Sequence, residues 1–185
     1  NLTDAAPVLA QYGIPAVVFV VTGRMGGMLD HDLDPATSTL LTWDQARELQ
    51  AMGVEIGGHT KTHRRLSQLS IPEQETEIVE CARQLRWELG AELPLFAYPF
   101  GSAFDYDKSS KELAKRAGFS CAYSNRYGGI RSGDDPWELR RIWIDASDSM
   151  ESFKSKVDGT LDMLAVFESR AGLYARKLLN RFTRG

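Results

Sequence analysis

The sequence predicts an α/β fold built on a mainly parallel sheet. Two observations lead to this prediction. Apolar, β-branched segments that read as buried strands alternate with segments of helical periodicity, and helix start and stop signals separate them. Five strands are expected, joined by right-handed crossovers, and five is too few for a complete (β/α) barrel. The alternation by itself supports an incomplete barrel and an open, doubly wound sheet equally.

The strands are predicted from runs of apolar and β-branched residues. Residues 16–21 form a continuous run, as parallel strands covered on both faces usually do. The run at 139–144 alternates instead, which puts Arg141 and Trp143 on one face. The predicted strands cover residues 16–21, 54–56, 93–98, 119–124 and 139–144.

The predicted helices have residues at their ends that start or stop a helix. Thr42 caps a helix that Gly53 ends. Ser70 and Glu73 form a capping-box pattern before a helix that continues to Gly90 with apolar residues at helical spacing. The predicted helices run from Thr3 or Asp4 to Gly13, over 43–52, from Ser70 to Gly90, from Asp107 through Ala117, from Ser149 into the 160s, and after Gly172.

Length and composition are those of one globular domain. The chain has 185 residues, of which 43% are hydrophobic and 25% are charged. A net charge of -3 argues against a general nucleic-acid binder, and no apolar run approaches the length of a membrane span. We expect one domain over residues 1–169 and a basic helix at 170–185 that packs on it.

His31 and both cysteines are expected to lie outside any metal or catalytic site. His31 is flanked by acidic residues in a long loop at 23–42, and we expect it to be solvated rather than a ligand. Cys81 and Cys121 are far apart in sequence and lack the spacing of metal ligands, so we expect two free, mostly buried thiols.

The segment at 54–63 contains the strongest candidate for a site. His59 and His63 follow a short strand and are four positions apart, so their imidazole rings can converge on one point. Neutral imidazole binds a borderline metal such as zinc near neutral pH. The alternative is a pair of surface histidines on a basic loop. The position at the carboxyl end of a strand favours a site, because α/β folds bind ligands there. Gly57 and Gly58 are expected to let the backbone leave the strand.

Three segments resemble the polysaccharide deacetylases, also called carbohydrate esterase family four or the NodB-homology domain. The segment at 59–63, His-Thr-Lys-Thr-His, resembles the second motif, in which two histidines hold a catalytic metal. The segment at 12–16, Tyr-Gly-Ile-Pro-Ala, is similar to the stretch after the first motif, and the segment at 96–101, Phe-Ala-Tyr-Pro-Phe-Gly, is similar to the third. The resemblance implies a distorted or incomplete (β/α) barrel of bacterial origin whose first strand is missing from this chain.

The resemblance also implies a role for each matching residue. His59 and His63 would bind a divalent metal, with zinc the expected ion, and the backbone N–H of Phe100 would stabilise an oxyanion. Tyr98, Pro99 and Phe100 would contact an N-acetylated polysaccharide or oligosaccharide. Tyr98 and Phe100 lie in an apolar strand-to-loop turn, so packing in the core is the alternative for both.

Two catalytic motifs of the family are missing. The Thr-Phe-Asp-Asp run, which carries the base and the third metal ligand, is expected just before Asn1. The Leu-x-His motif, whose histidine is the general acid, is also absent, and in some permuted branches of the family it precedes the first motif. Asp134 and Asp135 form the only Asp-Asp pair, which we interpret as part of a solvated turn.

One further departure concerns the arginine that orients the base in many family members. Ala97 stands at its position. Arg141, at the end of a later strand, is our candidate replacement, and a plain surface cation is the alternative. If Arg141 and Trp143 share a face of that strand, both are expected to turn inward together.

Three functions remain open on the sequence. The first is a metal-dependent N-deacetylase acting on glycans that contain N-acetylglucosamine, in a chain that lacks part of the catalytic set. The second is a hydrolase of small amides or cyclic imides on the same fold. The third is a pseudoenzyme or carbohydrate-binding domain without catalysis.

Overall fold

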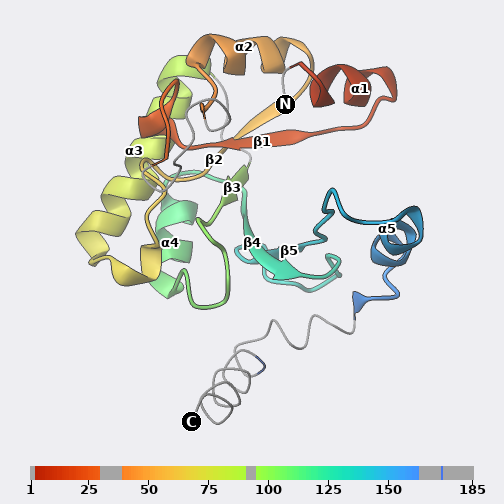
Figure 1. Ribbon diagram of the computed structural model, residues 1–185. Coiled ribbons are helices and arrows are strands. Elements are labelled where there is room, and N and C mark those ends of the chain that lie inside the picture. Colours follow the sequence, from red (N-terminus) through yellow and green to blue (C-terminus); the bar gives the residue numbers. More distant parts are fainter. Residues whose placement is uncertain (1–2, 30–38, 91–94, 163–171, 173–185) are drawn as a thin grey trace, which may run out of the picture.

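The computed structural model describes residues 3–29, 39–90, 95–162 and 172. These residues form a five-stranded parallel sheet with the strands in chain order (Figure 1). The strands are β1 (Val17–Val20), β2 (Glu55–Gly58), β3 (Leu95–Ala97), β4 (Cys121–Tyr127) and β5 (Leu139–Arg141). A doubly wound sheet reverses its strand order at a switch point, whereas a barrel keeps consecutive strands adjacent. The predicted α/β fold is confirmed, and the strand order is that of an incomplete barrel.

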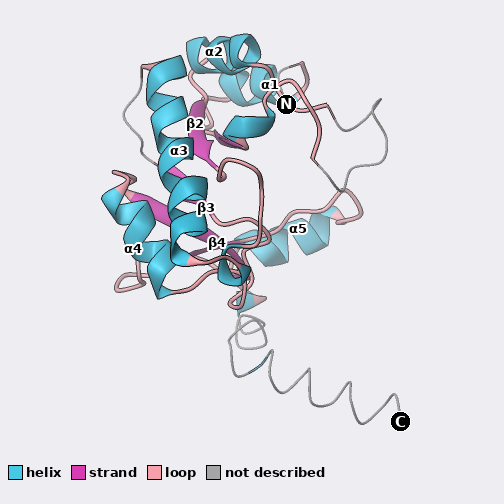
Figure 2. Ribbon diagram, turned by 90° about the vertical axis from the view of Figure 1, so that its left-hand side faces the viewer, coloured by secondary structure: helices cyan, strands magenta, loops and turns pink. Residues whose placement is uncertain are grey.

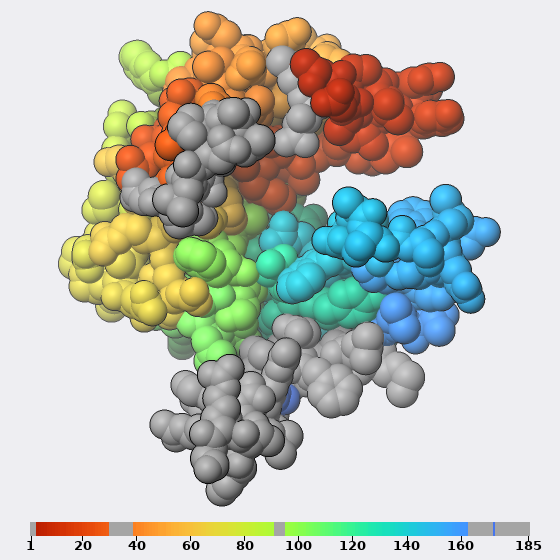
Figure 3. All heavy atoms as spheres, viewed as in Figure 1, coloured from red at the N-terminus to blue at the C-terminus, as the bar shows by residue number. Residues whose placement is uncertain are grey.

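The helices lie around this sheet. They are α1 (Ala5–Gln11), α2 (Trp43–Ala51), α3 (Ile71–Leu89), α4 (Lys108–Arg116) and α5 (Met150–Val157), with short 3₁₀ turns η1 (Thr22–Arg24) and η2 (Leu66–Gln68). Helices α3 and α4 pack beside each other over one face of the sheet (Figure 2). Helices α1 and α5 stand at its two ends, with an open gap between them (Figure 3). None of the described helices has the length and apolar character needed to cross a membrane.

The predicted caps of α2 and α3 are present. The backbone N–H of Gln45 donates to Thr42 Oγ1 at 3.2 Å, and Gln45 Oε1 accepts from the Thr42 N–H at 2.9 Å. The Ser70 N–H donates to Glu73 Oε2 at 2.9 Å, and α3 ends at Gly90 with φ 60°. Asp4 occupies the N-cap position of α1, as one of the two expected residues, but its side chain makes no capping hydrogen bond.

The structure moves the boundaries of three strands most. β4 runs to Tyr127 instead of ending at 124, because it pairs with β5 up to that residue. β2 continues through both glycines instead of ending at Ile56, because Gly57 and Gly58 pair with β1. Large side chains occupy the space on each side of the strand, so both positions need glycine. A Cβ on Gly57 would lie 2.6 Å from Phe19 Cδ1, and one on Gly58 would lie 2.8 Å from Phe119 Cζ. β5 stops at Arg141, because its partner β4 ends at Tyr127 opposite it. Residues 142–144 therefore do not extend the strand.

Pleating gives the sheet two different faces. On the face that α3 and α4 cover, Phe96 packs against Tyr98 and Phe119 with ring centroids 5.4 Å and 5.0 Å away. On the opposite face, which we call the inner face, the Phe19 ring lies 5.8 Å from that of Tyr123. Because side chains alternate along a strand, the inner face also receives the residue two positions after Gly57, which is His59.

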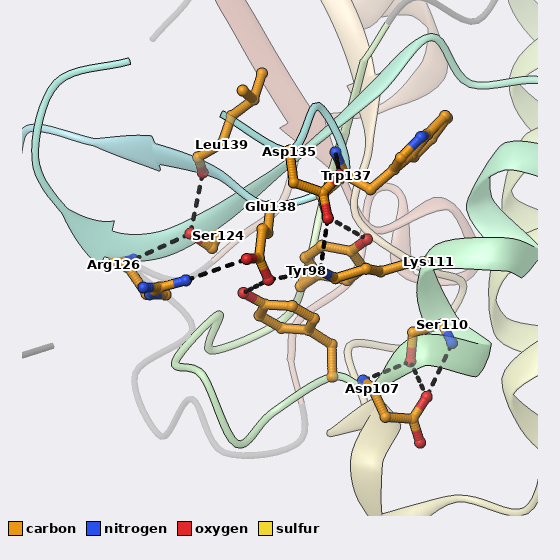
Figure 4. Close-up of polar contacts among 11 residues, drawn as sticks. Tyr98, Asp107, Ser110, Lys111, Ser124, Arg126, Asp135, Trp137, Glu138 and Leu139 are labelled. Atoms are coloured by element: carbon orange, nitrogen blue, oxygen red, sulfur yellow. Dashed lines mark hydrogen bonds and ion pairs between the residues drawn. The ribbon is translucent and has the colours of Figure 1, made fainter. Parts of the chain in front are cut away.

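A charged network replaces a helix in the connection between β4 and β5 (Figure 4). Lys111 Nζ lies 2.9 Å from Asp135 Oδ2 and 2.6 Å from Glu138 Oε2, and Arg126 Nη1 lies 3.5 Å from Glu138 Oε1. Asp134 Oδ2 accepts from the backbone N–H of Arg131 at 2.9 Å. Of the Asp-Asp pair, Asp134 therefore stabilises a turn and Asp135 forms an ion pair. In the network two acidic side chains balance two basic ones, beside a cavity of about 710 Å³.

Some expectations fall outside the described residues. They are the role of His31, the part of the predicted 23–42 loop that covers residues 30–38, and the basic helix at 170–185, of which only Gly172 is described. The helix predicted from Ser149 into the 160s is shorter than expected, because α5 ends at Val157.

Both cysteines are free thiols, and their environments predict different reactivity. Cys81 is fully buried, and burial raises the pKa of its thiol to about 12, whereas Cys121 is only half-buried. Because the thiolate is the reactive form, a disulfide reagent at pH 8 should label Cys121 first and Cys81 only after unfolding. Labelling followed by peptide mass spectrometry checks this order. Rapid labelling of both thiols in the native protein would contradict it, and Cys81→Ala should leave the native labelling unchanged.

Candidate metal centre

The two histidines of the 59–63 segment lie together at the carboxyl end of β2. Their ring centroids are 4.8 Å apart, and the ring planes are inclined by 62°. His59 directly follows the strand on the inner face, where the Phe19 ring lies 6.5 Å from it. This arrangement allows two imidazole nitrogens to approach one point, which is the requirement for sharing a metal ion.

A hydrogen bond sets the tautomer of His59. Its Nδ1 lies 2.7 Å from the backbone oxygen of Ala97 on β3. A carbonyl only accepts hydrogen bonds, so Nδ1 carries the proton and Nε2 keeps the lone pair. Burial lowers the pKa of His59 to about 4, with smaller contributions from the charges of His63 and Arg141. The ring is therefore neutral near pH 7 and presents Nε2 as a metal ligand.

The loop that joins the histidines has a strained backbone. Among the described residues, the non-glycine residues with positive φ are Thr60 at 65°, His63 at 64° and Phe100 at 61°. Such conformations persist only where the surroundings impose them, and they cluster at functional sites. Here the Thr60 side chain stabilises the strained backbone, since its Oγ1 accepts from the N–H of His63 at 3.0 Å. All three strained residues belong to the candidate site.

Phe100 lies beside the histidines from the loop after β3. The N–H of Gly101 donates to the Pro99 oxygen at 2.7 Å, which closes a tight turn around Phe100. Phe100 is 43% exposed, and its ring lies 5.1 Å from the ring of His63. Arg65 covers it, with Cζ 4.4 Å from the ring centroid, and also pairs with the buried Asp105. Arg65 therefore joins the loop after β2, which carries the histidines, to the loop after β3.

The structure does not place Tyr98 and Pro99 where a sugar could contact their side chains. Both are fully buried. Tyr98 points toward the helices, because pleating turns it to the same face as Phe96. Its ring stacks on Tyr106 at 4.1 Å, and its hydroxyl donates to the Trp137 oxygen at 2.9 Å. Tyr98 therefore takes the alternative role in the core, and of the three residues only Phe100 is exposed enough for the expected substrate contact, which stays a prediction.

Arg141 lies on the side of β5 that faces the histidines. It is half-buried, and its Nε–H donates to the Ser124 oxygen at 2.8 Å while Nη2 donates to Asn125 Oδ1 at 3.3 Å. It is close enough to His59 to contribute to the lowered pKa of that ring. The expected pairing with Trp143 is wrong: Trp143 lies beyond the end of β5 and is 47% exposed.

A cavity of about 470 Å³ opens beside the two histidines. Apolar side chains of β1 and of the segment after it form most of its wall, including Phe19, Val21 and Met25. A cavity lined by several apolar side chains with a few polar groups is typical of a small-molecule site. Within the described residues, no third His, Cys, Asp or Glu joins the histidines to complete a cluster of metal ligands. Two imidazole donors would fit zinc, and the described residues would supply two of its ligands.

Several residues around the site were not predicted from the sequence. Phe19 and Asn125 reach it through strand pairing, which no local pattern encodes. Glu77 on α3 is buried, and it contacts the loop between the histidines. A local signal did exist for Glu77, because it lies one turn before Cys81 on the buried stripe of an otherwise regular amphipathic helix.

The loop after β3 predicts a large effect for Gly101→Ala. Gly101 has φ 71°, and an added Cβ would lie 2.6 Å from the backbone nitrogen of Asn125. Gly133→Ala is the matched control, because Gly133 has φ 91° but no atom within 4 Å of an added Cβ. The control should lose about 1–2 kcal/mol of unfolding free energy from the left-handed backbone alone. Gly101→Ala should lose clearly more in urea unfolding, and equal losses would mean that the loop moves away freely.

Comparisons with known proteins agree with the geometry. A sequence profile of the polysaccharide deacetylase family matches residues 1–122. YxkH of Bacillus subtilis (strain 168), whose name assigns it to the polysaccharide deacetylases, is 23% identical over 158 residues, covering 85% of this chain and 52% of YxkH. The solved Streptococcus pyogenes deacetylase PplD in complex with acetate is 25% identical with a TM-score of 0.69, covering 82% of this chain and 62% of that one. IcaB from Ammonifex degensii is 23% identical with a TM-score of 0.64, covering 89% and 66%.

The chain spans about half the length of YxkH and less than two thirds of the PplD chain. The family profile nevertheless covers most of the described sheet, including β1, β2, β3 and the paired histidines. The fold, the histidine pair and the family profile agree, and we conclude that this chain belongs to the polysaccharide deacetylase family.

Proposed function

We propose that this chain carries part of the centre of a metal-dependent hydrolase, which removes N-acetyl groups from polysaccharide containing N-acetylglucosamine. The observation that carries the proposal is the His59–His63 pair, with one ring locked as a neutral donor by the Ala97 carbonyl. The family supports hydrolytic deacetylation as the reaction. The metal, its identity and the glycan are parts of this proposal.

His59 and His63 would hold zinc, with His59 binding through Nε2. When bound, zinc supplies a Lewis acid that polarises the amide carbonyl and lowers the pKa of a water molecule. The Ala97 carbonyl keeps the His59 ring in the required orientation and tautomer throughout the reaction. The apolar wall formed by Phe19 and its neighbours limits access of bulk water to one side of the histidines.

Phe100 and Arg141 would act on the substrate side of the centre. Phe100 lies in a tight turn with its ring 5.1 Å from that of His63, and its N–H is our candidate donor to the developing oxyanion. Arg141 is held by Ser124 and Asn125 with its guanidinium on the histidine side of the sheet. There it could orient a carboxylate base and keep it ionised.

The proposal predicts weak but specific zinc binding by the 185-residue chain. Two imidazoles without a carboxylate give an under-coordinated site, so affinity should be low and turnover of acetylated chitooligosaccharide poor or absent. Calorimetric titration should show binding that His59→Ala and His63→Ala each abolish. His31→Ala is the matched control and should bind as the wild type does. No zinc binding by the wild type would favour a carbohydrate-binding domain without catalysis, and robust chelator-sensitive turnover would contradict the expected inactivity.

A second prediction concerns Arg141. In any form of the protein that deacetylates, Arg141→Ala should lower turnover by more than about tenfold, equivalent to about 1.4 kcal/mol of transition-state stabilisation. Arg140→Ala is the control, because Arg140 is the neighbouring arginine of β5 and has no role in the proposed centre. Steady-state kinetics on an N-acetylglucosamine oligosaccharide measures both. Equal rates for wild type and Arg141→Ala would remove the assigned role.

A further inference from the structure

Glu77 is a buried carboxylate that the proposed chemistry does not use. It lies on α3 and is 4% exposed, in a helix stripe shared with Gln74, Ile78 and Cys81. Acidic side chains are seldom fully buried unless hydrogen bonds or charges compensate the loss of water. The partners of Glu77 therefore indicate what keeps it in this position.

Those partners are two consecutive residues between the histidines. Glu77 Oε2 accepts from the backbone N–H of Thr62 at 2.8 Å, and Oε1 accepts from the Thr62 hydroxyl at 2.5 Å. The backbone oxygen of Glu77 accepts from the N–H of Lys61 at 3.0 Å. One residue of α3 thus binds the middle of the His59–His63 loop at three points.

The other side of the loop is attached to the end of β1. The N–H of His59 donates to the Val20 oxygen at 3.0 Å, and the Thr60 oxygen accepts from the Thr22 N–H at 3.2 Å. The loop is therefore held between β1 and α3. These contacts hold the loop in place against the strain of positive φ at Thr60 and His63.

We propose that Glu77 is a positioning residue of the metal centre, which holds Thr62 and thereby sets the position of His63 relative to His59. This inference rests on the proposed function. His59 is fixed independently by β2 and the Ala97 carbonyl, so relaxation of the loop would displace His63 in particular. The two rings would then no longer converge on one ion.

The experiment compares zinc binding with the order of the loop. Glu77→Ala removes both side-chain acceptors, and Thr62→Val removes only the hydroxyl at nearly constant shape. Glu80→Ala is the matched control, because Glu80 lies on the same helix and pairs at the surface with Arg83 at 2.7 Å. Glu77→Gln keeps an acceptor for the Thr62 N–H and should retain most of the function.

Three quantities are measured on each variant: zinc affinity by calorimetry, amide hydrogen exchange at residues 60–63 by NMR, and thermal unfolding without metal. Glu77→Ala should weaken zinc binding by at least about tenfold, the usual effect of losing a group that orients metal ligands. Its loop amides should exchange faster, while amides of β3 and β4 keep their protection. Thr62→Val should show the same changes to a smaller extent, and Glu80→Ala neither.

Other outcomes separate this inference from the proposed function. If wild type binds no zinc, the proposed function fails, and exchange at residues 60–63 alone decides whether Glu77 holds the loop. If Glu77→Ala binds zinc like wild type with unchanged loop exchange, the positioning role is wrong. A uniform loss of protection across the sheet with unaltered zinc affinity would assign Glu77 to general stability instead. If Glu77→Ala does not fold, Thr62→Val decides by the same measurements.

Discussion

The hydrogen bond from His59 to the Ala97 carbonyl connects the sheet to the candidate metal centre. It exists because β2 and β3 are parallel neighbours with Gly58 opposite Phe96, which puts His59 beside Ala97. A change of register by one residue would turn His59 to the helix-covered face. Strand pairing thus decides both the position of this ring and which of its nitrogens carries the lone pair.

Close packing around β2 makes that pairing specific. The two glycines leave room for Phe19 on one face and for Phe119 on the other. A side chain at either position would have to displace an aromatic ring, so the strand has one well-packed arrangement in this sheet. The same glycines precede the first histidine, and the packing that fixes the strand therefore also fixes the start of the loop.

Several elements together hold the two strained segments of the site, which are the loop between the histidines and the turn at Phe100. β1 and α3 hold the loop between the histidines, and the Arg65 side chain links it to the turn at Phe100 and to the buried Asp105. Because the strain is local and the anchors come from several elements, the site depends on the tertiary structure around it. The histidine spacing alone would allow many arrangements of the two rings.

The sequence by itself determined the α/β class, the main helices with their caps, and the candidate ligands His59 and His63. These follow from local chemistry: apolar periodicity, capping residues such as Thr42 and Ser70, and a short spacing between two imidazoles. The sequence suggested a substrate contact for Tyr98, because no local pattern shows which face of the sheet a residue occupies. It paired Arg141 with Trp143, because no local pattern shows where β4 ends. The strand order, the faces of the sheet and the contact of Glu77 with the loop were decided only by the tertiary structure. Each of them depends on contacts between segments distant in sequence, whose geometry no local pattern specifies.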